Sequence, residues 1–148
     1  MAATLSTLPR LATLILAWMP LTPAVLTTLQ SLTNLSALQL LECRGVHGGE
    51  MLEAAAQLHG LTKLHMHSVE GAMGGEVEHG VAAVARQLPH LADFSCMGVY
   101  GPSMQPMLSR LAGLHGLVRL RLGAPTGRWA SQLTALSALT ALTALQVR

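Results

Sequence analysis

The sequence predicts an α/β fold in which short strands alternate with helices and stack into a curved solenoid. The pattern L-x-x-L-x-x-L-x-L is plainest in the last fifteen residues up to Val147, LTALSALTALTALQV. A spacing of three matches neither a helix, with a period of 3.6, nor a strand, with a period of 2, so the pattern indicates a helix end that leads into a short strand. The same pattern occurs six times, and the stretches between the copies are rich in helix-forming residues.

The six copies keep one frame of four apolar positions and start 24 to 30 residues apart. They are Leu8, Leu11, Leu14, Leu16; Leu32, Leu35, Leu38, Leu40; Leu58, Leu61, Leu64, Met66; Leu88, Leu91, Phe94, Cys96; Leu114, Leu117, Leu120, Leu122; and Leu139, Leu142, Leu145, Val147. The longest interval contains the stretch EGAMGGEVEHG. Repetition of this kind predicts a strand of about three residues in each unit, followed by a turn, a helix and a return.

Helices are expected between the frames, at residues 22–31, 49–57, 76–87, 103–112 and 129–136. Pro23 and Pro106 stand near the start of two of them, where proline is well tolerated. The stretch MLEAAAQ in the second is composed largely of good helix formers. The glycine pairs Gly48–Gly49 and Gly74–Gly75 are expected to form turns just before their helices.

The residues between and beside the frame leucines should line the concave face of the sheet, because successive side chains of a strand point to opposite faces. From the first two strands these are Thr13, Ile15, Ala17, Ala37, Gln39 and Leu41. From the third to the sixth they are Lys63, His65, His67, Asp93, Ser95, Met97, Arg119, Arg121, Gly123, Ala144, Gln146 and Arg148. The face therefore changes from apolar and neutral to basic along the solenoid, with Asp93 as an acidic exception.

The frame resembles the leucine-rich repeat, whose unit has roughly 20–29 residues. In that family an Asn or Cys often follows the frame by three residues, and its side chain bonds the backbone of neighbouring turns. Here Cys43 matches, whereas the corresponding places hold Met19, Val69, Val99 and Pro125. The ladder of bonds that the resemblance implies is therefore expected to be mostly missing.

The resemblance implies a non-enzymatic module that presents its concave sheet to a partner protein. It also allows a sensing or substrate-recognition arm of a larger protein, such as a ubiquitin ligase, a receptor or a kinase, or a purely structural tract. Similar alanine- and threonine-rich repeats occur in cytoplasmic scaffolds, in ubiquitin ligases and in proteins of the ciliary axoneme. A cytoplasmic location, with the cytoskeleton or cilium as narrower options, is the matching expectation.

Length and repeat number predict one domain, residues 1–148, of about six repeats. Solenoids are usually closed by polar capping units, and neither end of the sequence carries one. We therefore expect a segment of a longer solenoid whose terminal repeats fray.

Composition excludes several classes of protein. The chain is 51% hydrophobic, 11% charged and has a net charge of +2, which does not indicate a nucleic-acid-binding protein. The stretch LATLILAWMPLTPAVLTTL is long enough to cross a membrane, but Pro20 and Pro23 would break a helix there. Cys43 and Cys96 are too few for a disulfide framework and fit a reducing compartment.

No sequence motif of a hydrolase, a nucleotide-binding protein or a zinc protease is present, so neither an enzyme nor a cofactor is expected. His65, His67 and Asp93 have side chains that bind zinc in other proteins. The simpler interpretation is that the two histidines are solvated side chains on a binding face, and we expect no metal.

The candidate partner-binding residues are Lys63, His65, His67, Asp93, Arg119 and Arg121. A basic centre on a concave sheet favours docking of an acidic protein segment. The alternative is that these charges only keep an apolar sheet soluble. RNA is disfavoured because the patch has no aromatic stacking platform, and Trp18 and Trp129 are expected to pack under loops.

Overall fold

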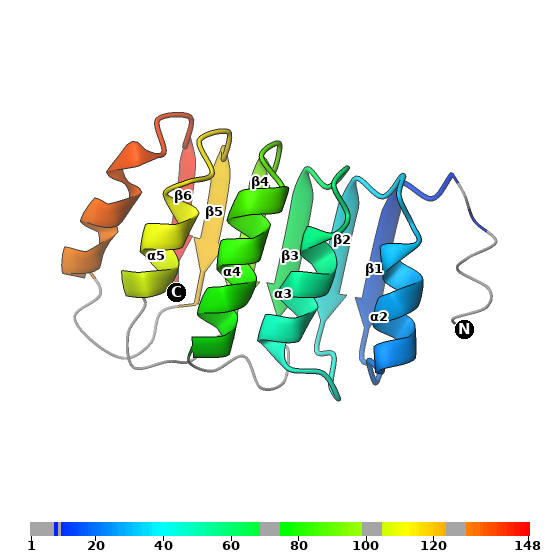
Figure 1. Cartoon of the computed structure of the whole chain (residues 1–148). Coiled ribbons are helices and arrows are strands. Elements are labelled where there is room, and N and C mark those ends of the chain that lie inside the picture. Colours follow the sequence, from blue (N-terminus) through cyan, green and yellow to red (C-terminus); the bar gives the residue numbers. More distant parts are fainter. Residues whose placement is uncertain (1–7, 9, 69–74, 99–104, 124–129) are drawn as a thin grey trace.

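The computed structural model describes residue 8 and residues 10–68, 75–98, 105–123 and 130–148. Its centre is a six-stranded parallel sheet in which the strands follow the chain in order from β1 to β6 (Figure 1). The strands are β1 (Thr13–Ala17), β2 (Ala37–Leu41), β3 (Lys63–His67), β4 (Asp93–Met97), β5 (Arg119–Leu122) and β6 (Ala144–Val147). The helices are α2 (Pro23–Gln30), α3 (Gly48–Ala56), α4 (Gly75–Gln87), α5 (Gln105–Leu111) and η1 (Ala130–Ala138). The helices stand in a row along one face of the sheet, so the other face is left to the side chains of the strands (Figure 1).

The strands pair in an unshifted register that confirms the repeat frame. Leu14 pairs with Leu38, Leu38 with Leu64, Leu64 with Phe94, and so on to Leu145. The first four strands have five residues each, longer than the three expected from the frame. The strands are longer because the residues on either side of the frame also pair with the neighbouring strands.

The frame side chains form the core between the sheet and the helices. Leu38, Leu64 and Leu120 are fully buried, and Phe94 fills the corresponding place in β4. Burial of the frame is incomplete in the first and last repeats, where Leu8, before β1, is 45% exposed and Leu145, in β6, is 43% exposed. An edge repeat has a neighbour on one side only, so part of its apolar surface stays in contact with water.

The predicted helices are present with shifted ends, and the last differs in kind. Residues 130–138 form a 3-10 helix, whereas the sequence suggested an ordinary helix at 129–136. The leucine spacing of three explains the difference, because a 3-10 helix has three residues per turn and stacks such side chains on one side. Leu136 within this helix and Leu139 directly after it are both buried. Trp129 lies outside the described residues.

Gly48, Gly49 and Gly75 belong to the helices themselves, which corrects the prediction that these glycines form turns before them, and Gly74 lies outside the described residues. Helix α3 begins at Gly48 and α4 begins at Gly75. Within α4, a Cβ atom on Gly80 would lie 2.6 Å from Cβ of Leu52 and 2.7 Å from the carbonyl oxygen of Gly49. Gly80 therefore allows α3 and α4 to approach more closely than an alanine would permit.

A left-handed residue follows each of the first four strands. These residues are Trp18, Glu42, Ser68 and Gly98, with φ between 50° and 79°. The N–H groups of the first three donate to the carbonyls of Leu41, His67 and Met97 on the next strand. Trp18 is 78% exposed, so the expectation that it packs under a loop is wrong. Its left-handed backbone is shared with the corresponding residues of the next three repeats.

A hydrogen-bonded ladder links neighbouring repeats just before each strand. The carbonyl of Ala12 accepts from the N–H groups of both Ser36 and Ala37, and the carbonyl of Ser36 accepts from Thr62 and Lys63 in the same way. The pattern continues through the carbonyls of Thr62, Ala92 and Val118. Hydroxyl groups of Ser36, Thr62 and Thr143 add further donors. This ladder was not predicted, because it depends on backbone groups.

The expected turn contact is present at Cys43. Its buried thiol lies 3.5 Å from the carbonyl oxygen of Leu16 and 3.6 Å from that of Leu41, which confirms a link to the preceding repeat. Met19 is partly buried, and Val69, Val99 and Pro125 lie outside the described residues. Cys96 is buried in the core, as expected, and neither cysteine is in a disulfide.

Candidate protein-interaction face

The register brings the six candidate residues onto three adjacent strands, on the face opposite the frame side chains. Lys63 pairs with Asp93 and Asp93 with Arg119, while His65 and Arg121 flank Ser95. The predicted neighbours are confirmed, but the arrangement is not an open basic patch. Instead, four side chains converge, and we call His65, Asp93, Arg119 and Arg121 the Asp93 cluster.

Asp93 is the centre of this cluster, and its side chain is only 7% exposed. Its Oδ1 lies 2.9 Å from Nε2 of His65 and 3.9 Å from Nη1 of Arg121, and its Oδ2 lies 3.2 Å from Nε of Arg119. His65 is a diagonal neighbour of Asp93: it lies on the adjacent strand, two residues beyond Lys63, which pairs with Asp93 directly. Long side chains can span such a diagonal in a sheet. A buried carboxylate is costly unless it is paired in this manner.

The hydrogen bond between His65 and Asp93 assigns the tautomer of the imidazole. A carboxylate can only accept, so Nε2 of His65 carries the proton and donates to Asp93. Nη1 of Arg121 lies 3.4 Å from the same nitrogen and is also a donor. It therefore approaches His65 without a hydrogen bond, and its partner in the cluster is the carboxylate.

The surroundings shift the pKa values of both groups downward. Burial lowers the pKa of His65, and the charges of Lys63 and Arg121 act in the same direction, while Asp93 opposes them. Burial would raise the pKa of Asp93, but the hydrogen bond to His65 and the charges of His65, Arg121 and Arg119 outweigh it. At neutral pH the cluster thus contains a neutral imidazole and an ionised carboxylate.

His67 does not join this cluster. Its Nδ1 lies 3.7 Å from Oε1 of Glu42, and its side chain is 52% exposed. The three residues weighed as zinc ligands are thus divided between two contacts, His65 with Asp93 and His67 with Glu42. Across the residues that the structure describes, no group of three or more His, Cys, Asp or Glu side chains converges as a metal site would require.

Glu42 is a residue of this face that the sequence analysis missed. It follows β2 directly and donates its N–H to the carbonyl of His67. The available signal was its place one residue after the strand end, since the register puts Leu41 beside His67.

The Asp93 cluster and Lys63 carry an excess of positive charge. Lys63, Arg119 and Arg121 contribute three positive charges, and Asp93 removes one. The side chain of Arg119 is 57% exposed although its Nε atom is held by Asp93. A guanidinium fixed through Nε keeps its two terminal nitrogens in the geometry that binds a carboxylate through two bonds.

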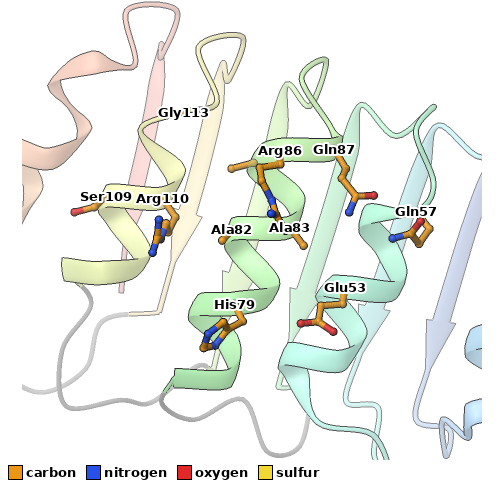
Figure 2. A pocket seen from close by; sticks show the side chains of 11 residues that line it. Glu53, Gln57, His79, Ala82, Ala83, Arg86, Gln87, Ser109, Arg110 and Gly113 are labelled. Atoms are coloured by element: carbon orange, nitrogen blue, oxygen red, sulfur yellow. The ribbon is translucent and has the colours of Figure 1, made fainter.

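The helical face has an open groove of about 690 Å³ over α4. Figure 2 shows Glu53 of α3 and Gln57, which directly follows α3, on one side of it, His79 and Arg86 of α4, and Arg110 of α5 on the other side. None of the predicted partner-binding residues lines this groove. Its cations and anions are mixed, and Arg110 already lies 3.6 Å from Glu78.

The unshifted strands, one for each leucine frame, and the helices along one face establish the architecture. The chain folds as a leucine-rich-repeat solenoid. No protein-family model matches the sequence, and no curated protein matches it. In the part of the chain that the structure describes, no helix has the length and apolar character needed to cross a membrane.

Two solved structures from Listeria monocytogenes str. 4b F2365 are among those similar to this chain. The internalin inlF has 14% identity and a TM-score of 0.37, over 82% of this chain and 45% of its own. The internalin C2, inlC2, has 17% identity and a TM-score of 0.42, over 100% of this chain and 76% of its own. This chain thus spans less than half of inlF.

Proposed function

We propose that this chain is a non-enzymatic protein-interaction module that binds an acidic segment of a partner protein on its concave face. The observation that supports the proposal most directly is the Asp93 cluster. A buried carboxylate holds two arginines in fixed positions on a face that is not covered by helices (Figure 1). Fixing the arginines before binding reduces the entropy that they lose when a partner arrives.

The charges on this face suit an acidic partner better than solubility alone would require. Charges that only keep a sheet soluble have no need of a buried counter-ion, since they are stable in water. Asp93 carries the cost of burial, and its effect is to order Arg119 and Arg121. The same face would serve if the chain were the recognition arm of a larger ubiquitin ligase, receptor or kinase. A cytoplasmic location, with the cytoskeleton or cilium as narrower options, stays a prediction from the sequence.

The test is selection of binding peptides from a random displayed library, followed by affinity measurement against two matched variants. Arg119→Gln with Arg121→Gln removes two charges from the concave face. Arg86→Gln with Arg110→Gln removes the same charge from the helical face. We expect the selected peptides to be acidic and to lose most of their affinity for the first variant only. Peptides that bind both variants equally well would contradict the proposal.

A further inference from the structure

The concave face has one continuous row of side chains that changes character along its length. The register places one residue from each strand in this middle row, and its members are Ile15, Gln39, His65, Ser95, Arg121 and Gln146. The row begins with an aliphatic side chain, continues through amide, imidazole and hydroxyl groups, and reaches a guanidinium on β5. A segment that crosses the strands along this row would meet these groups in that order.

The apolar end of the row is an exposed isoleucine. Ile15 is 54% exposed, although isoleucine is among the residue types most often buried. Its neighbours on β1, Thr13 and Ala17, are small and also exposed. Ile15 therefore projects from this face without a large neighbour on its own strand, and an apolar side chain that covered it would be favoured by the loss of water-exposed surface.

The centre of the row offers hydrogen-bonding groups. Gln39 is partly buried, and its amide can both donate and accept. Ser95 is buried at 6% exposure between His65 and Arg121, so Gln39 is the more accessible of the two groups. An extended peptide needs such partners because its own backbone N–H and C=O groups lose water when it binds.

The cationic part of the row, next to its last member, is held in position. Nη1 of Arg121 lies 3.9 Å from the carboxylate of Asp93, and Arg119 is tied to the same carboxylate through Nε. Four strand spacings separate Ile15 from Arg121, which is about 19 Å at the usual spacing of about 4.8 Å. An extended peptide advances about 3.3 Å per residue, so about six residues cover this distance.

We propose that the middle row binds an extended peptide that carries an aliphatic or aromatic residue at Ile15 and an acidic residue at Arg121, about six residues apart. This inference rests on the proposed function and adds the apolar contact, the direction across the strands and the spacing.

A peptide fits this row better than a nucleic acid does. A nucleic acid carries a charge on every nucleotide, whereas the Lys and Arg side chains within the strands of this face belong to β3 and β5 alone. The described residues of β1 to β6 that face away from the core include no Phe, Tyr or Trp, so the stacking surface typical of single-strand binders is not provided there.

The experiment uses fluorescent peptides of identical composition in which an apolar residue and an acidic pair are separated by about six or about three residues. Dissociation constants are measured by anisotropy with the wild-type chain, Ile15→Thr, Arg121→Gln and the helical-face control Arg86→Gln. Threonine keeps the β-branch that suits a strand, so Ile15→Thr should fold. We expect the longer spacing to bind about tenfold tighter. Ile15→Thr should abolish that preference, Arg121→Gln should weaken both peptides, and Arg86→Gln should change neither.

Three outcomes would overturn the inference. If both spacings bind with equal affinity and Arg121→Gln still weakens binding, the proposed apolar contact and the proposed spacing are wrong. The proposed docking of an acidic segment is then still supported. If Arg121→Gln also has no effect on affinity, both this inference and the proposed function are wrong. A single-stranded oligonucleotide that binds as tightly as the better peptide, with no effect of Ile15→Thr, identifies nucleic acid as the occupant instead.

Discussion

His65 donates from Nε2 to Oδ1 of Asp93 over 2.9 Å, although the register pairs Asp93 with Lys63 rather than with His65. The diagonal contact matters because the same carboxylate is also within 4 Å of both arginines of β5. One acidic side chain thereby organises three basic ones.

Replacement of Asp93 by asparagine should destabilise the fold. The variant leaves His65 and two arginines without their shared carboxylate, and we expect a loss of about 1–3 kcal/mol in the free energy of unfolding. Chemical denaturation followed by circular dichroism measures this loss. The control is Glu78→Gln, which removes the exposed partner of Arg110 and should cost less than about 1 kcal/mol. An equal or larger loss for Glu78→Gln would show that the Asp93 cluster does not stabilise the fold.

Acidification should weaken the fold in two separate steps. The pKa of folded His65 lies below its ordinary value of 6.5, so the unfolded chain takes up a proton first and stability falls as the pH decreases from about 6.5. The pKa of folded Asp93 lies below 3.8, so its contribution is present above that pH and is lost as the pH falls through the lower folded value. Urea denaturation at a series of pH values should show both steps.

The variant His65→Gln separates these two contributions. It removes the group that titrates in the upper range, so the slope of stability just below pH 6.5 should decrease while the lower step persists. An unchanged slope in the upper range would assign that step to other histidines.

Gly80→Ala should destabilise the chain even though alanine is the better helix former. The added methyl group would meet Leu52 and the backbone of Gly49, and overpacking of this kind costs about 1–3 kcal/mol. The gain in helix propensity is only about 1 kcal/mol. Gly113→Ala is a suitable control because its Cβ would meet only the carbonyl oxygen of Arg110, at 3.4 Å. Thermal unfolding should show a lower midpoint for the first variant alone.

Ser68→Gly should stabilise the chain. Ser68 has a φ of 50°, a conformation that costs an ordinary residue about 1–2 kcal/mol. Glycine loses more entropy on folding, so the expected net gain is up to about 1 kcal/mol. The reverse change at the corresponding position, Gly98→Ala, should destabilise, since its φ is 79° and its Cβ would lie 3.0 Å from the backbone of Ser68. The midpoints of chemical denaturation test both changes, and a loss of stability in Ser68→Gly would contradict this account.

Both cysteines should be unreactive in the folded chain. Burial raises the pKa of Cys96 to about 12 and also raises that of Cys43. The thiolate is the reactive form, so a thiol reagent such as Ellman's reagent should react slowly under native conditions and fully after denaturation. Rapid labelling of either thiol in the native chain would show that its repeat opens readily.

The fold could be predicted from the sequence because the leucine frame marks one strand in every repeat. It also predicted which residues share the concave face, since the period of a strand is two and all six strands are in register. It did not predict the contact between His65 and Asp93, because a diagonal contact depends on side-chain rotamers. It also did not predict the left-handed backbone of Trp18 or Glu42, since these residue types give no signal for it, nor the carbonyl ladder, which any residue can form.

The middle row contains none of the leucine-frame residues, and this separation affects how the protein can evolve. At Ile15, Gln39 or Gln146 a substitution changes the surface without emptying a place in the core. Partner choice at these positions can therefore diverge freely while the fold is inherited unchanged. Strand β4 is different because Asp93 and Ser95 face the concave side and are nevertheless buried. A mutation at β4 that alters binding also alters the stability of the fold and is selected against for that reason. The residues at the two ends of the row should therefore be substituted faster during evolution than those at its centre.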